Sequence, residues 1–414
     1  MRTPHGWPDW VITNHSVEFK PIKGDAVKHM PHELRVVSKP APARIPAIEG
    51  LRGVAMTLVF FGHFEALFRG YLPVGGASAR LVEFLAVIGH QGVCFFLVLS
   101  GYFVYKCYLD HPSRYAAFTV RRISRIYPPY VAMCGLYVVL CFLSPVHSKI
   151  PAGHAGLVYL ALNLLMISSR PLITVAWTIG TLVALYALLP PFWAAVRFER
   201  WKPGHRIALI MVCGAFWQYI PKSIPVLDGR VAFVLVGFAL YEAVAAGAAF
   251  ESRGELRGLA ILGYGYVLWY AADHGWLSFL HLPKLWDHYT FLAPGIYYAC
   301  GYVIHNRGRI AGFLGQLGLP RLGRISYAYY LCHGLVLKSL SVLLLTLRPQ
   351  ASPSVGIFWL GLPVAYACTL IAGWSWFHVV ETRLATLLVR TPGSVLESIP
   401  NARLRQCLPG MPVA

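Results

Sequence analysis

Residues 49–64 read EGLRGVAMTLVFFGHF, a stretch apolar enough to enter a membrane that nevertheless carries Arg52 and His63. The chain of 414 residues is 57% hydrophobic and only 13% charged, whereas a soluble domain is about 25% charged. Apolar segments follow one another almost continuously from residue 46 to residue 380. Because no soluble core could bury so much apolar surface, the composition predicts an all-α, polytopic membrane helical bundle.

The apolar runs predict about ten transmembrane helices. An eleventh run, 156–169, is short and is interrupted by Asn163, so we interpret it as an interfacial or re-entrant helix. With the N-terminus inside, this count places most Lys and Arg in cytoplasmic segments, which is the bias expected of membrane proteins. We therefore expect an integral protein of the cell (inner) membrane with both termini cytoplasmic. The ten runs lie near 46–68, 82–105, 127–145, 175–196, 207–221, 230–249, 257–273, 289–305, 326–347 and 354–379.

Three parts are expected along the chain: a polar cytoplasmic tail (1–43), a membrane domain (44–381) and a second cytoplasmic tail (382–414). The net charge of +19 would suggest nucleic acid on a soluble protein. Here the basic cytoplasmic segments explain it, so we expect a lipid bilayer as partner and no nucleic acid. The nine cysteines show no CxxC pair, and the histidines show no metal spacing, so no metal site is expected.

Arg52 and His63 are eleven residues apart, which places them on one helix face, about 16 Å apart along the axis. Ionisable groups inside a span usually face the bundle interior and mark a substrate or proton path. Two alternatives stay open, namely that Arg52 reaches to the interface and that His63 is a hydrogen-bonded core histidine. Glu49, one turn before Arg52, could pair with it.

Two further stretches carry polar groups beside apolar spans. In GVCFFLVLSGYFVYK (92–106), Ser100 precedes a glycine, and such a small pair permits close helix packing or the approach of a ligand. In RRISRIYPPY (121–130), Arg121, Arg122 and Arg125 cluster where the chain re-enters the membrane. The cluster is either a positive-inside signal with lipid headgroup contacts or a phosphate clamp, since guanidinium matches phosphate geometry.

Taken in order, four segments resemble acyltransferase family 3, whose members are integral membrane acyltransferases that act mostly on sugar hydroxyls. The segments are IPAIEGLRGVAMTLVFFGHF, GVCFFLVLSGYF, RRISRIYPPY and RISYAYYLCHGL (324–335). The resemblance covers about 46–381. It implies about ten core helices and an acyl-CoA donor on the cytoplasmic side, with acetyl-CoA the commonest donor.

The resemblance also implies roles for particular residues. The family's first helix carries an arginine or lysine, ten residues and a histidine; here these are Arg52 and His63, both implied to be essential, with His63 as catalytic base. Arg121, Arg122 and Arg125 match the family's cytoplasmic arginine cluster, and we expect them to bind the CoA phosphates. The implied acceptor is a saccharide or glycolipid.

The chain departs from the family pattern in a middle helix. The run WTIGTLVALYALLP (177–190) retains Trp177, Tyr186 and Pro190, but Leu182 and Val183 stand where acidic residues are common. If that carboxylate orients the acceptor or assists the base, another residue must supply it. Candidate substitutes are Glu65, Glu83 and Glu242. Near the end of the membrane domain, HVVETR (378–383) retains Glu381, whereas Arg383 replaces the usual proline.

The mechanism expected from these residues is direct transfer, with His63 deprotonating the acceptor hydroxyl. A ping-pong route with Ser100 or a histidine as relay is the alternative. His333, a second intramembrane histidine near the cytoplasmic end of its span, has a structural or a catalytic role. Trp177 anchors the membrane interface or stacks on a sugar. Two other functions stay open: a transporter or flippase that uses the Arg/His path, and a sensor or scaffold that keeps only the fold.

Overall fold

The fold of the chain is all-helical in the part that the computed structural model describes. All described residues belong to one compact unit, Pro42–Ala414. The predicted tail 1–43 lies outside them, as does 384–414 of the second tail. The structure describes residues 45–111, 115–143, 149–217, 231–248, 250, 254–277, 288–306, 308–316, 318–347 and 354–383.

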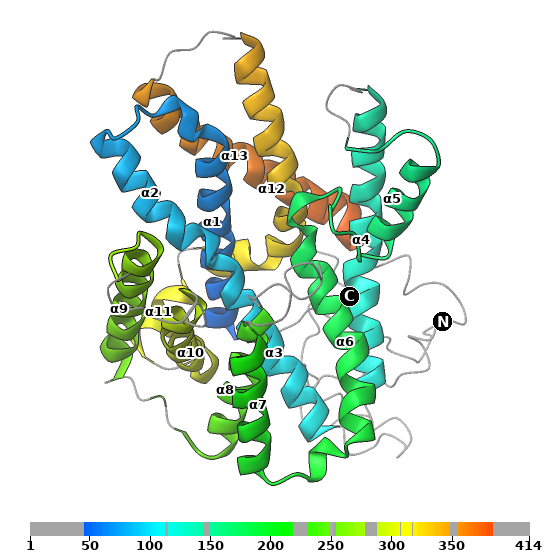
Figure 1. Cartoon of the computed structure of the whole chain (residues 1–414), viewed down its shortest axis with the longest axis vertical. Coiled ribbons are helices and arrows are strands. Elements are labelled where there is room, and N and C mark those ends of the chain that lie inside the picture. The colour runs from blue at the N-terminus through cyan, green and yellow to red at the C-terminus, as the bar shows by residue number, and fades with distance from the viewer. Residues whose placement is uncertain are drawn as a thin grey trace, which may run out of the picture. The chain divides into compact units, whose positions relative to one another are not determined.

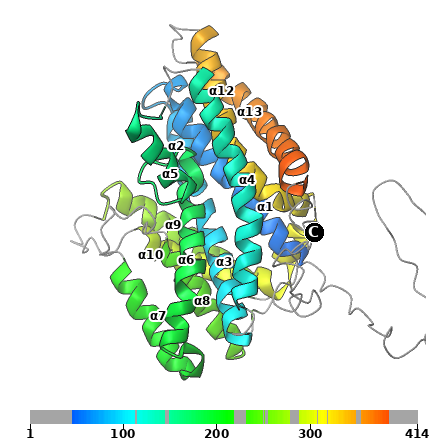
Figure 2. The ribbon, with the colours of Figure 1, turned by 90° about the vertical axis from the view of Figure 1, so that its right-hand side faces the viewer.

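The described part of the chain contains thirteen α-helices (Figures 1 and 2). Three short 3-10 turns and one π-helical turn, Phe377–Glu381, punctuate them. The helices are α1 (Pro46–Phe68), α2 (Ala77–His90), α3 (Gly92–Asp110), α4 (Tyr115–Leu143), α5 (His154–Leu164), α6 (Trp177–Ala195), α7 (Pro203–Trp217), α8 (Ala232–Ala245), α9 (Glu255–Asp273), α10 (His288–His305), α11 (Arg309–Leu314), α12 (Leu319–Leu347) and α13 (Val355–Trp376).

Each predicted span coincides at least in part with a helix, and six helical segments of the described residues are long and apolar enough to cross a membrane. These six segments are 46–71, 92–110, 118–143, 174–195, 319–347 and 355–381. The protein is therefore an integral membrane helical bundle, while the count of ten spans stays a prediction. The eleventh run forms α5, whose 11 residues are about 16 Å long, much less than the ~30 Å hydrocarbon core.

The predicted span 82–105 is in fact two helices, because the chain breaks at Gln91 between α2 and α3. Glycines on both sides of the break lie directly against α1. A Cβ at Gly89 would stand 2.5 Å from the backbone nitrogen of Gly62, and a Cβ at Gly92 would overlap the carbonyl oxygen of Ala55. The break lets α2 and α3 approach α1 at separate places, which a single straight helix could not do.

Two helices begin earlier than the apolar pattern indicated. α4 starts at Tyr115 and continues through Pro128 and Pro129, so the arginine cluster is helical rather than part of a loop. α12 starts at Leu319, with a proline in its first turn, where a missing N–H costs nothing. His333 consequently lies near the middle of α12 and not near the end of a span, which corrects the prediction.

α1 and α12 form the central helix pair, and glycines set the distance between them. A Cβ at Gly323 of α12 would overlap the carbonyl oxygen of Glu49, and one at Gly53 would lie 2.6 Å from the carbonyl oxygen of Leu319. In lipid, helices associate through close van der Waals packing at small residues rather than through the hydrophobic effect. α2, α3 and α13 also pack against α1, and α13 packs against α12.

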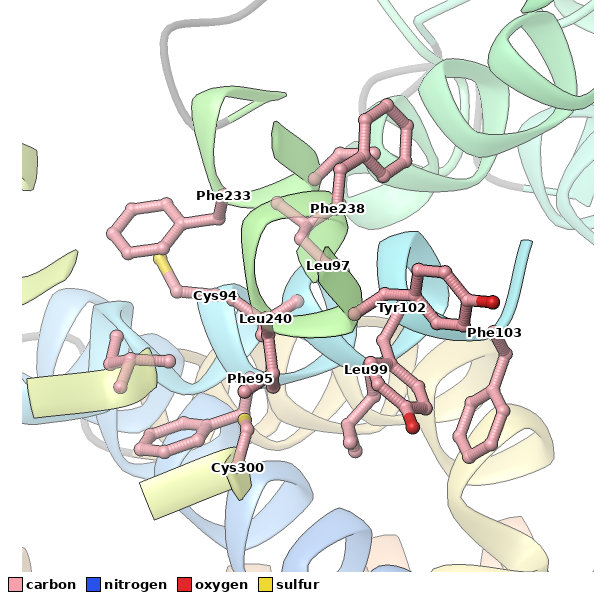
Figure 3. Packing of buried hydrophobic residues seen from close by; sticks show 14 of the residues in the cluster. Cys94, Phe95, Leu97, Leu99, Tyr102, Phe103, Phe233, Phe238, Leu240 and Cys300 are labelled. Carbon is pink, nitrogen blue, oxygen red and sulfur yellow. The ribbon is translucent and has the colours of Figure 1, made fainter. Parts of the chain in front are cut away.

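α3 and α8 form a second close pair, supported by reciprocal glycines. A Cβ at Gly101 would overlap the carbonyl oxygen of Val234, and a Cβ at Gly237 would overlap that of Val98. Figure 3 shows buried side chains of α8, such as Phe238 and Leu240, packed against those of α3, with Cys300 of α10 beside them. The predicted close packing at the Ser100–Gly101 pair is therefore found.

We predict that Gly323→Ala destabilises the protein, because the added methyl group has only the fixed backbone of α1 to displace. Overpacking of this kind costs about 1–3 kcal/mol, occasionally more. The measurement is thermal unfolding in detergent, followed by the loss of the monodisperse peak. The matched control is Gly361→Ala in α13, where a Cβ meets nothing within 4 Å. Equal melting temperatures for the two variants would contradict the close approach.

Candidate functional site

A cavity of about 180 Å³ lies between α1, α3, α4, α6 and α12, and we call it the arginine cavity. Its wall is mainly apolar, so the few polar groups that line it stand out as the groups that could hold a ligand. These polar residues are Glu49, Arg52, Ser100, Arg122, Arg125, Thr178, Tyr186, Ser326, Tyr327 and Tyr330.

Arg52 points into the bundle and is held there from two helices. Its Nη1 donates to both carboxylate oxygens of Glu49 at 3.2 Å, and its Nη2 donates to the hydroxyl of Ser326 at 2.9 Å. The side chain is 19% exposed. The predicted pair with Glu49 is confirmed, and these contacts favour the interior interpretation of Arg52 over one that reaches to the interface.

Arg122 and Arg125 lie one turn apart on α4, so they share a face. Arg125 is paired with Glu381 on the π-helical turn, with Nη2 to Oε1 at 3.0 Å. Arg122 differs, because its Nε and Nη2 are buried without a hydrogen-bond partner among the described residues. Its guanidinium lies over the ring of Phe118, 5.0 Å from the centroid. Buried N–H groups without partners are rare in native structures, so Arg122 is a residue that could hold an anion.

His63 and His333 form a pair of rings, which we call the histidine pair. Their centroids are 5.0 Å apart and the rings are nearly perpendicular. The Nδ1 of His63 lies 2.9 Å from the carbonyl oxygen of Val59, and that of His333 lies 2.9 Å from the carbonyl oxygen of Tyr330. A carbonyl only accepts, so each Nδ1 carries a proton and each Nε2, in a neutral ring, keeps its lone pair. Two basic nitrogens thus stand near each other.

Tyr330 connects the histidine pair with the arginine cavity. Its side chain lines the cavity, and its ring centroid lies 5.6 Å from that of His333. Its hydroxyl donates to the carbonyl oxygen of Val175 and lies 2.6 Å from the hydroxyl of Thr178. The Tyr330 ring is therefore held between the cavity and the histidine pair. The site is a series of arginines, a tyrosine and histidines contributed by α1, α4 and α12.

The structure brings most of the predicted site residues together, although not all in one cavity. Ser100 lines the arginine cavity, whereas His63 and His333 lie beyond Tyr330. Trp177 begins α6 and packs against the core beside the cavity without being among its lining residues. Arg121 lies in α4, and its side chain is outside the described part.

The carboxylates expected to replace the missing acid are engaged elsewhere. Glu65 and Glu83 both pair with Arg69, and Glu242 pairs with Arg206 on another part of the bundle. Leu182 lines the arginine cavity, so the position where the family has acidic residues does face the site. Among the described residues that line this cavity, the acidic side chain is that of Glu49.

The hydroxyl groups that α12 contributes to the site were not predicted from the sequence. Ser326, Tyr327 and Tyr330 all belong to the segment 324–335 that carried the resemblance, yet only its histidine was singled out. Their recurrence on one helix was the signal available. Their roles depend on partners far away in the chain, such as Thr178, which no sequence pattern reveals.

A family model described as an acyltransferase domain matches residues 45–375 of the chain. The chain belongs to acyltransferase family 3. Because that match covers most of the chain, the protein is a membrane enzyme that transfers acyl groups, as the resemblance predicted. No curated protein and no solved structure matches it.

The two neighbouring arginines give a test that separates ligand binding from stability. Arg122→Met removes a cation whose buried Nε and Nη2 have no hydrogen-bond partner among the described residues, so the melting temperature is expected to stay equal or to rise. Arg125→Met leaves the buried Glu381 without its cation, so the melting temperature is expected to fall. Removing one partner of a fully buried pair costs about 3–5 kcal/mol, and the 29% exposure of Arg125 places the loss below that range.

Both variants are measured by thermal unfolding in the same detergent. An Arg122→Met protein that unfolds as early as Arg125→Met would show that Arg122 has a structural role, and would contradict its assignment as an anion site.

Proposed function

We propose that the protein is a membrane O-acyltransferase that moves an acyl group, by family frequency acetyl, from acyl-CoA to a hydroxyl of a saccharide or glycoconjugate. The donor is proposed to enter from the cytoplasmic side, with both termini on that side. One observation carries the proposal: Arg122 lines a cavity together with Arg52 and Arg125, and its buried Nε and Nη2 have no hydrogen-bond partner in the described part of the chain. Guanidinium groups suit phosphate oxygens, so the residues present fit a CoA diphosphate.

The arrangement supports an elongated donor rather than a compact one. Arg122 and Arg125 lie at one end of the site and the histidine pair at the other, and Arg52 and His63 are about 16 Å apart along α1. The pantetheine arm, which is long and flexible, would extend from the arginine cavity past Tyr330. The thioester would then lie between Arg52 and the histidine pair.

His63 is proposed as the base. Its Nδ1–H donates to the carbonyl oxygen of Val59, so Nε2 is the ring nitrogen that would accept the proton of the acceptor hydroxyl. As the hydroxyl oxygen bonds to the thioester carbon, the carbon–sulfur bond breaks and the thiolate leaves. The proton held on His63 then passes to that thiolate, which departs as the thiol of CoA. Direct transfer of this kind needs no covalent enzyme intermediate.

His333 is proposed to position and electrostatically support His63 rather than to react. It is fully buried, and its Nε2 has no hydrogen-bond partner among the described residues. The ring centroids of the two histidines are 5.0 Å apart, and Nε2 of His333 is proposed to share a proton or a water with the base when the imidazolium forms. The perpendicular packing of the two rings also restricts the orientation of His63.

We predict that His63→Ala lowers acyl transfer by about 10²–10⁴-fold, which is the usual contribution of a general base. Membranes containing the protein would receive radiolabelled acetyl-CoA and the native glycan fraction, and label in the glycan would be counted. His154→Ala, at an exposed histidine at the start of α5, is the matched control and should retain wild-type transfer.

A His63→Ala protein that transfers the acyl group at the wild-type rate would contradict the assignment of His63 as the base. Absence of transfer by the wild-type protein with every acyl-CoA and glycan supplied would contradict the proposed donor or acceptor. Movement of unmodified solute across vesicles by that same protein would favour a transporter instead.

A further inference from the structure

A second cavity, of about 320 Å³, adjoins the arginine cavity and has a different character. It lies where the beginning of α12 meets the end of α13 and the π-helical turn, and we call it the α12–α13 cavity. Glu49, Arg52 and Arg125 line both cavities, so the two are adjacent spaces with a shared wall. The residues found only in the second are Arg321, Arg324, Ile325, Trp374, Phe377 and His378.

The charge of this cavity is unbalanced. Arg52 is paired with Glu49, and Arg125 is paired with Glu381. Arg321 and Arg324 stand one turn apart on α12, both exposed, and no carboxylate pairs with either among the described residues. Two adjacent guanidinium groups without counter-ions, at the wall of a cavity, form a site for an anion that carries two charges.

The other wall of the cavity is aromatic. The rings of Trp374 and His378 are 4.5 Å apart, and the ring of Phe377 lies 5.1 Å from that of His378. Trp374 is 56% exposed. The π-helical turn, Phe377–Glu381, supplies two of these rings and the carboxylate that holds Arg125. Such irregular turns often occur at functional sites, and exposed rings beside arginines suit the stacking of a planar base.

We propose that the α12–α13 cavity binds the nucleotide end of the donor, with a phosphate monoester on Arg321 and Arg324 and the base against Trp374 and His378. This inference rests on the proposed acyl-CoA donor. It extends that proposal, because the cluster on α4 accounts only for the diphosphate. Since the two cavities share Arg52 and Arg125, one elongated ligand can occupy both. The nucleotide would lie in the α12–α13 cavity, the diphosphate at Arg122 and the shared arginines, and the acyl arm in the arginine cavity.

The experiment compares acetyl-CoA with acetyl-3′-dephospho-CoA, which lacks the phosphate monoester. Binding to the purified protein in phosphatidylcholine nanodiscs is measured by calorimetry, and KM is measured by transfer. The wild-type protein is expected to bind acetyl-CoA about tenfold or more tightly than the dephospho form, since charge-assisted hydrogen bonds are among the stronger ones. In Arg321→Gln/Arg324→Gln this preference should vanish, because the phosphate monoester would no longer meet the two guanidinium groups.

Two controls locate the effect. Arg257→Gln, at an exposed arginine of α9, should retain the full preference. Trp374→Ala should weaken the binding of acetyl-CoA and of acetyl-3′-dephospho-CoA by the same factor. The binding of acetyl-pantetheine, which lacks the base, should not change.

Each other result overturns the inference. A preference for the 3′-phosphate that survives in the double variant would place that phosphate elsewhere while leaving the acyl-CoA proposal intact. A defect of the double variant seen only when phosphatidylglycerol replaces phosphatidylcholine would make the bound phosphate a lipid headgroup. A wild-type protein that binds neither nucleotide and transfers no acetyl group would remove the proposed function and this inference together.

Discussion

The close contact between α1 and α12 is the constraint on which the rest of the site depends. The backbone of α1 at Glu49 leaves no room for a side chain at Gly323. With the two helices this near, Arg52 reaches the hydroxyl of Ser326, and the rings of His63 and His333 meet further along the same pair. A small displacement of either helix would separate both contacts, since neither involves a flexible loop.

The pairing of the buried charges explains which arginines are structural and which are available. A charge inside a bilayer is costly unless it is paired or lines a polar cavity. Arg52 and Arg125 meet this requirement within the fold through Glu49 and Glu381. Arg122 has no carboxylate partner among the described residues, and its buried Nε and Nη2 mark the place where the proposed ligand would bind. The proposed anionic donor would pair with Arg122 and would be oriented by Arg52 and Arg125.

Sequence reasoning located the class of fold and the helix that carries Arg52 and His63, because hydropathy and the 3.6-residue period are local properties. It also predicted the Glu49–Arg52 pair, which lies within one turn. It failed at Gln91, where packing of Gly89 and Gly92 against α1 divides one apolar run into two helices. The contact between His63 and His333 joins residues 270 positions apart, and so no local pattern could reveal it.

The central claim is that one elongated donor lies along α1 and α12 with its acyl end at His63. The most direct measurement is a cryo-electron microscopy map of the protein in nanodiscs with a non-hydrolysable thioether analogue of acetyl-CoA. The account predicts density from Arg122 past Tyr330, with the diphosphate on the arginines and the acetyl carbon about 3–4 Å from the Nε2 of His63. Density that leaves Arg122 without a partner, or that places the acetyl group away from the histidine pair, would contradict it.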